Sequence, residues 1–187
     1  PISVKKADYD MSRFIFSDTV VFYNGMKQSI NYAGILPVGL DGSSPEYSII
    51  GGGINAGQYS VIISFKTDSS NYNTPETKTA VLTVKPYVAK AVWEGTSFVY
   101  DGDMKVPCCY YKDIFGRKVE LDVLGGASFA GIYTALANTS DTNYILDMPT
   151  VKFEIKKADY DFSGVYWSNS GFVYDGTEKE VTLCGLP

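Results

Sequence analysis

The stretch AGQYSVIISF, residues 56–65, decides the fold class because apolar and polar residues alternate along it. The residues of one face are Tyr59, Val61, Ile63 and Phe65. The opposite face carries serines, and successive side chains of a strand point to opposite faces, so this period of two is typical of a half-buried β-strand. The same period recurs at residues 151–156, and no window favours a helix. The sequence therefore predicts an all-β fold.

The sequence also repeats itself with a period of about 75 residues, which is typical of a tandem array. Three short motifs recur in the same order: Tyr-Asn/Asp-Gly, Ala-Gly-x-Tyr and Asn-Tyr. Their positions are 23–25, 100–102 and 174–176 for the first, 56–59 and 130–133 for the second, and 71–72 and 143–144 for the third. The hexapeptide KKADYD occurs twice without change, at residues 5–10 and 156–161.

These motifs divide the chain into four parts. Residues 1–4 would end a preceding repeat, 5–85 form a first β-sandwich repeat, 86–155 a divergent second repeat, and 156–187 the truncated start of a third. KKADYD then marks the joint at which the last strand of one repeat passes into the next. The chain begins at Pro1 and carries no signal peptide, so we expect a section of a longer protein.

Five glycines are expected to have structural roles. Gly25, Gly102 and Gly176 each follow Asn or Asp. Such pairs tolerate positive φ, so they predict tight hairpin turns. Gly57 and Gly131 belong to the Ala-Gly-x-Tyr motif, which we place at a corner between strands.

The tyrosines of that motif, Tyr59 and Tyr133, favour one kind of sandwich. In immunoglobulin-like domains a tyrosine near the start of the sixth strand hydrogen-bonds back across the corner, and a cysteine often follows two residues later. Here Val61 and Ala135 stand at the cysteine position. We therefore predict tandem immunoglobulin-like β-sandwiches without that disulfide. A β-grasp is the alternative, but it requires a helix.

Composition excludes several functions. The net charge is −5, which argues against nucleic acid or anionic membrane as a partner. The absence of histidine removes Ser–His–Asp and Cys–His catalysis and the commonest metal ligand. We expect the three cysteines, Cys108, Cys109 and Cys184, to be thiols that pack as small apolar residues, although a bridge to Cys184 stays open. No apolar run is long enough to span a membrane, so we expect no direct membrane insertion.

In order and spacing, these motifs resemble the MBG-type repeats of bacterial surface proteins. The strings that carry the resemblance are residues 5–12, 55–59, 71–73, 80–85, 173–177 and 185–187. The resemblance implies tandem domains in large secreted or wall-attached, adhesin-like proteins. The second repeat departs from the pattern, because residues 86–93 lack Asp-Tyr-Asp and residues 110–113 replace Gly-Leu-Pro.

Two groups of residues are weak candidates for binding. Each KKADYD joint contains two carboxylates, Asp8 with Asp10 and Asp159 with Asp161, but Ca²⁺ needs six to eight oxygen ligands. The middle joint has no such pair, so we expect linkers, with no metal site, cofactor or catalytic residue. Tyr110 and Tyr111 replace Ala33 and Gly34 of the first repeat, and alternation would turn one of them outward as a ligand contact.

The function predicted from these features is a structural spacer, not an enzyme, in a bacterial extracellular or cell-wall-attached adhesin-like protein. Its partners would be the neighbouring repeats of the same chain. The alternative is a module that binds a host glycan or protein through loops or the Tyr110/Tyr111 region. Apolar residues of 156–187, such as Phe172 and Val181, lack cover, so this tail would pack on the second repeat or pair with another chain.

Overall fold

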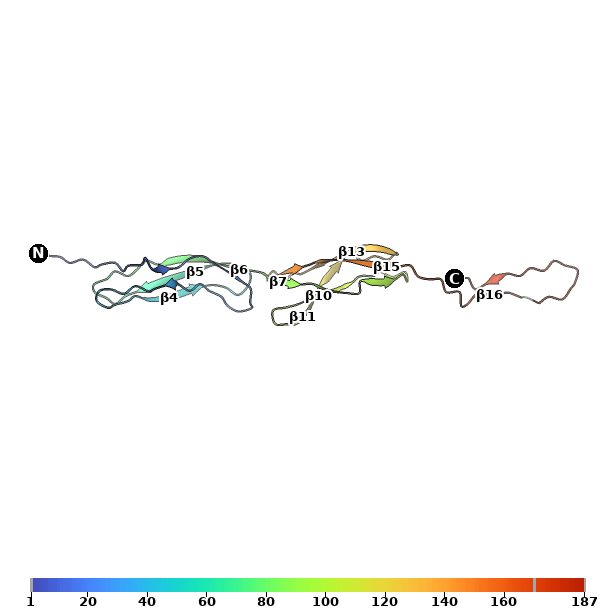
Figure 1. Cartoon of the computed structure of the whole chain (residues 1–187), viewed down its shortest axis with the longest axis horizontal. Helices are drawn as coiled ribbons and strands as arrows, with labels where there is room; N and C mark the ends of the chain where they lie inside the picture. The colour runs from blue at the N-terminus through green and yellow to red at the C-terminus, as the bar shows by residue number, and fades with distance from the viewer. Residues whose placement is uncertain (1, 170, 187) are drawn as a thin grey trace.

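The computed structural model describes residues 2–169 and 171–186, and these form strands but no helix (Figure 1). The predicted all-β fold is confirmed. The β-grasp alternative finds no support in the described part of the chain, because its helix is missing there. Nor does this part contain a helix of the length and apolarity that a membrane crossing requires. We call residues 5–85, 86–155 and 156–187 the first, second and third units.

The first unit is built on one four-stranded sheet. The strands of the whole unit are β1 (Phe14–Ile15), β2 (Thr19–Phe22), β3 (Ala33–Gly34), β4 (Glu46–Gly51), β5 (Gly57–Lys66) and β6 (Lys78–Lys85). The sheet has the order β2-β6-β5-β4, in which β2 runs parallel to β6 and the other neighbours are antiparallel. The short strands β1 and β3 pair separately.

The second unit repeats this arrangement. Its strands are β7 (Tyr87–Lys90), β8 (Val92–Glu94), β9 (Ser97–Val99), β10 (Cys108–Lys112), β11 (Lys118–Glu120), β12 (Asp122–Leu124), β13 (Gly131–Asn138), β14 (Tyr144–Asp147) and β15 (Thr150–Lys156). The sheet β9-β15-β13-β12 has the same order and directions as β2-β6-β5-β4. A three-stranded sheet, β8-β10-β11, takes the place of β1-β3, and β7 pairs in parallel with β14.

The core of each unit lies on one face of its larger sheet. Val61 and Ile63 of β5 are fully buried while Ser60 is exposed, as the alternation predicts. Val61 packs with Leu82 and Val84 of β6. The second core gathers Ala135, Phe153 and Ile155 in the corresponding strands. Apolar residues, Val61 and Ala135, thus fill the positions two residues after Tyr59 and Tyr133.

The two corner tyrosines hydrogen-bond back along the chain. The Tyr59 hydroxyl donates to the Asn55 carbonyl at 2.8 Å, and the Tyr133 hydroxyl donates to the Phe129 carbonyl at 3.0 Å. Gly57 and Gly131, each two residues before its tyrosine, lie against the tyrosine rings. A Cβ at Gly131 would be 3.0 Å from the Tyr133 hydroxyl, so the motif brings backbone and ring into close contact.

The predicted hairpin turns at Gly25, Gly102 and Gly176 are wrong in type. A type I′ hairpin needs positive φ at both central residues, whereas here only the glycine has it. The preceding Asn or Asp instead accepts a hydrogen bond from the backbone two residues on, as in Met26 N–H to Asn24 Oδ1 at 2.9 Å. These are Asx turns, and β2 pairs with the distant β6 rather than with the segment after the turn.

The third unit is a short hairpin of β16 (Tyr166–Trp167) and β17 (Leu183–Cys184), which extends beyond the second unit (Figure 1). Beyond residues 157–160, which lie near Tyr100 and Ala130, the described residues of this tail do not pack on the second unit, and pairing with another chain stays a prediction. Tyr174 is 91% exposed, and Phe172 and Val181 are also exposed. The described residues supply counterparts of β1 and β3 but none of β4, β5 or β6, so no sheet covers them.

Candidate functional site at the junction of the first two units

A single residue joins the first two units. β6 ends at Lys85 and β7 begins at Tyr87, with Pro86 between them. The Lys85 carbonyl accepts a hydrogen bond from Tyr23 N–H at 2.8 Å, and Tyr87 N–H donates to the Asn143 carbonyl at 2.8 Å. Proline fixes its own φ, so the connection has little freedom to bend. The chain therefore passes from one sheet to the next under hydrogen-bond restraint on both sides.

Asp113 organises a loop of the second unit that faces this junction. Its carboxylate accepts hydrogen bonds from Phe115 N–H at 2.8 Å and Arg117 N–H at 2.9 Å. The same carboxylate pairs with Arg117 Nε at 2.7 Å. Burial raises the pKa of Asp113, but these hydrogen bonds outweigh burial and the pKa is lowered overall. The charged carboxylate is the form that holds the loop.

The loop presents Ile114 and Phe115 to the first unit. Both lie against Gly25, where an added Cβ would be 2.7 Å from the Phe115 ring. Beside them, the rings of Tyr23 and Tyr144 meet edge to face at 5.6 Å, and Tyr144 is buried. Its hydroxyl accepts from Ile114 N–H at 3.4 Å. The junction is thus a small aromatic core shared by the two units.

Asn143 adds a polar link across the same junction. Its side-chain carbonyl accepts a hydrogen bond from Ala56 N–H at 2.7 Å, and its amide donates to Asn55 Oδ1 at 3.4 Å. Asn55 and Ala56 belong to the corner that Tyr59 closes. One asparagine therefore ties the second unit to the tyrosine corner of the first.

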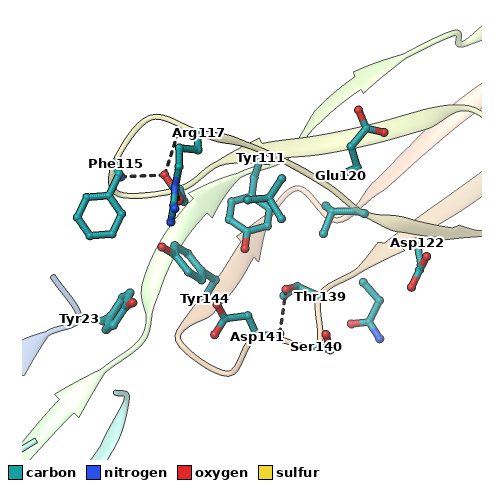
Figure 2. A pocket seen from close by; sticks show the side chains of 14 residues that line it. Tyr23, Tyr111, Phe115, Arg117, Glu120, Asp122, Thr139, Ser140, Asp141 and Tyr144 are labelled. Atoms are coloured by element: carbon teal, nitrogen blue, oxygen red, sulfur yellow. Dashed lines mark hydrogen bonds and ion pairs between the residues drawn. The ribbon is translucent and has the colours of Figure 1, made fainter. Parts of the chain in front are cut away.

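A cavity of about 270 Å³ opens beside the junction (Figure 2). Tyrosines from both units line it, together with Thr139 and Ser140 and the acidic residues Asp113, Glu120, Asp122 and Asp141. Burial raises the pKa of Tyr111 and of Tyr144, so both phenols stay neutral in ordinary buffers. Because the Asp113 carboxylate is already engaged by three hydrogen bonds, it is poorly placed to transfer a proton.

The first unit carries the same contact elements at its own N-terminal end. The loop from Gly39 to Ser43 has the same backbone hydrogen bond as the Asp113–Arg117 loop. Gly39 N–H donates to the Ser43 carbonyl at 2.7 Å, and Asp113 N–H donates to the Arg117 carbonyl at 3.0 Å. Leu40 N–H donates to the Tyr72 hydroxyl at 2.8 Å, as Ile114 does to Tyr144. The loop and the tyrosine hydroxyl that form the junction in the second unit thus have counterparts in the first unit.

The tyrosine pair predicted as a ligand contact is divided between interior and surface. Tyr111 is only 2% exposed and packs against Tyr144 with ring centroids 5.0 Å apart. Tyr110 is half-buried on the opposite side of β10, where Lys118 Nζ lies 4.3 Å from its ring. Alternation along the strand therefore leaves Tyr110 as the residue of the pair that faces outward.

Three of the predicted junction carboxylates accept hydrogen bonds within their own unit. Asp8 accepts from Asn73 Nδ2 at 2.8 Å, while Asp10 and Asp161 accept from the backbone two residues on. Hydrogen bonds from the side chain and then the backbone of Ser12 lower the pKa of Asp10, and those of Ser163 lower the pKa of Asp161 in the same way. No group of three or more potential metal ligands occurs among residues 2–169 and 171–186, which include Asp159. All three cysteines are free thiols.

Sequence reasoning missed Asp113, Arg117, Phe115 and Asn143 as junction residues. The repeated Asn-Tyr pair was the available signal, since Asn71–Tyr72 matches Asn143–Tyr144. The Asp113 loop gives no such signal, because the first unit has Gly39 at the corresponding place.

Comparisons with known proteins add no identification. No protein-family model matches the chain, and no curated protein matches its sequence.

Proposed function

We propose that this chain is a section of a rod of tandem immunoglobulin-like β-sandwiches whose role is structural. The junction carries this proposal, because it joins two units of the same sheet order through one proline and a shared aromatic core. A flexible tether would need neither feature. Units that contact only their neighbours make a quasi-one-dimensional array, which suits a spacer.

Two observations support the immunoglobulin-like assignment within this proposal. The antiparallel order β4-β5-β6 corresponds to strands C, F and G of that fold, and Tyr59 lies near the start of β5 as the corner tyrosine does near the start of F. The second unit repeats both features with β12-β13-β15 and Tyr133. The opposite layer is much smaller than in an antibody domain.

The expected setting is the surface of a bacterium, in a secreted or wall-attached adhesin-like protein. The MBG-like order of motifs supports this setting, and free thiols agree with a fold that does not rely on oxidation. A rod there would hold a distal domain away from the cell. The role is non-catalytic, with neighbouring units as its partners.

Small-angle scattering on the full chain tests the rod. We expect a maximum dimension that matches the end-to-end arrangement of Figure 1. The double variant Tyr23→Ala, Asn143→Ala removes the aromatic and polar links of the junction and should broaden the distance distribution. Tyr47→Ala with Asn169→Ala, two residues outside the junction, is the control. A compact particle, or an unchanged distribution in the junction variant, would contradict the proposal.

Binding of a glycan or protein at the junction is a second candidate function. The observation in its favour is the cavity lined by Tyr23, Tyr111 and Tyr144, since aromatic faces and nearby hydroxyl and carboxylate groups suit polar ligands. Outside the cavity, the half-buried Tyr110 gives a further outward-facing contact. A glycan array with the full chain tests this candidate. Glycan binding by the full chain that is lost in each of the variants Tyr110→Ala and Tyr23→Ala would support this candidate function. Binding no stronger than background would exclude it.

A further inference from the structure

The two copies of KKADYD have the same sequence but different surroundings. Tyr9 of the first copy is 7% exposed, whereas Tyr160 of the second is 75% exposed. Local structure does not explain this difference, because Asp10 and Asp161 cap the same turn, to Ser12 and Ser163. The difference must come from what covers each copy.

An extended segment centred on Tyr72 covers the first copy. Ala7 N–H donates to the Asn71 carbonyl at 2.8 Å, and Asn73 N–H donates to the Ala7 carbonyl at 2.8 Å, in a parallel bridge. The Tyr72 ring stacks on the Tyr9 ring with centroids 4.5 Å apart. The Asn73 side chain donates to Asp8, so backbone, ring and carboxylate of the hexapeptide are all engaged.

The second unit uses the same arrangement with different residues. Its lead strand β7 pairs in parallel with β14, which begins at Tyr144, and the preceding Asn143 reaches the corner residue Ala56 of the unit before. An Asn-Tyr strand thus closes its own unit and also fastens that unit to its predecessor.

The corresponding groups of the third unit are in place but uncovered. Ala158, Asp159 and Tyr160 lie around a cavity of about 470 Å³ together with Tyr100 and Ala130 of the second unit. Ala130 is the counterpart of Ala56, and Tyr100 that of Tyr23. Among the described residues, no strand pairs with Ala158.

We propose that residues 157–160, with Tyr100 and Ala130, form an acceptor site for an extended peptide strand that carries the sequence Asn-Tyr-Asn. The strand would run parallel to residues 157–160, exchange backbone hydrogen bonds with Ala158 and stack its tyrosine on Tyr160. Its first asparagine would accept from Ala130 N–H, as Asn143 accepts from Ala56. This is strand addition to an open edge, with side-chain contacts that set the sequence. It does not depend on the proposed spacer role.

A synthetic peptide with the sequence of residues 66–78 tests the site. It contains Asn71–Asn73, the partner of the first copy. In titrations of the isotope-labelled full chain followed by NMR, millimolar peptide should produce saturable shifts at the amides of Ala158, Tyr160 and Ala130. The amide of Ala7 should not shift, because its own strand already occupies it.

Matched variants distinguish binding at this site from nonspecific binding of the peptide. Tyr160→Ala should weaken binding about fivefold through loss of ring stacking, while Tyr174→Ala, at another exposed tyrosine of the same tail, should not. A peptide with alanine in place of Asn71 and Tyr72 should not bind. Absence of shifts with the natural sequence would overturn the proposal. The proposal would also fail if the peptide does not bind and the chain self-associates in a way that Tyr160→Ala abolishes. The occupant of the site would then be a second copy of the chain.

Discussion

Tyr111 shows how one residue changes the end of a unit. Its counterpart in the first unit is Gly34, which has φ of +87° and where a Cβ would lie 2.0 Å from the Arg13 carbonyl oxygen. In the second unit β10 runs on as a regular strand, and Tyr111 packs into the junction core beside Tyr144. The divergence of the second unit therefore adds apolar contact where it meets the first.

Asp113 should make the second unit sensitive to acid. Its pKa is lowered in the folded chain, so its contribution to stability is complete above the unfolded pKa of about 3.9 and is lost as the pH falls through the folded value. Asp113→Asn should flatten the fall in the free energy of unfolding below about pH 4. Urea titrations at several pH values measure this slope. Asp68→Asn, which also removes one carboxylate but at an exposed ion pair, is the matched control.

Cys108 and Cys109 should differ sharply in reactivity. Cys108 is exposed, whereas Cys109 is 2% exposed and burial raises the pKa of its thiol. The thiolate is the reactive form, so a thiol reagent should modify Cys108 quickly and Cys109 only on unfolding. Mass spectrometry after timed labelling measures both, and Cys108→Ser removes the fast site. Rapid labelling of Cys109 in the native chain would show that β10 is placed wrongly.

At the scale of elements, strands β5 and β13 organise their units. Each pairs with neighbours on both sides, and each carries a tyrosine near its start that hydrogen-bonds to the preceding corner. The corner then supplies groups to the junction, since Asn55 and Ala56 contact Asn143. A local motif is thereby connected to the contact between units.

Loss of the corner hydrogen bond should weaken both units by a similar amount. We expect Tyr59→Phe and Tyr133→Phe each to lower the free energy of unfolding by about 1 kcal/mol, because each removes one hydroxyl donor and keeps the ring. Urea denaturation measures the change, with Tyr166→Phe in the exposed tail as control. If neither substitution has an effect, the corners do not depend on these bonds.

At the scale of the whole molecule, Gly25 and Gly102 form a natural pair for testing the junction. Both have positive φ, so alanine should cost about 1–2 kcal/mol of backbone strain at either position. Only at Gly25 would the new Cβ meet a neighbour, the Phe115 ring, whereas nothing lies within 4 Å at Gly102. Gly25→Ala alone should therefore loosen the junction as well.

Scattering and urea denaturation of the two variants distinguish strain from contact. Similar losses of stability, with a broader distance distribution only in Gly25→Ala, are the expected result. Equal distributions in both variants would mean that the Phe115 contact does not hold the units in line.

The repeat and the strand periods were predictable because they depend on local pattern. Alternation along residues 57–65 places Val61 and Ile63 inward in any half-buried strand. The turn type at Asn24–Gly25 was not predictable in this way, because the parallel pairing of β2 with β6 joins segments far apart in the chain. The Asp113 loop was missed for the same reason, since its target, Gly25, belongs to another unit.

KKADYD separates what the sequence determined from what the tertiary structure decided. The hexapeptide itself determines the Asx turn, because Asp10 and Asp161 each bond a backbone two residues away. It does not determine whether its tyrosine is buried, since Tyr9 is 7% exposed and Tyr160 is 75% exposed. The stacking and pairing that bury Tyr9 come from Asn71–Asn73, across a long stretch of chain. Turns depend on neighbouring residues, whereas burial depends on a distant strand that only the fold brings into contact.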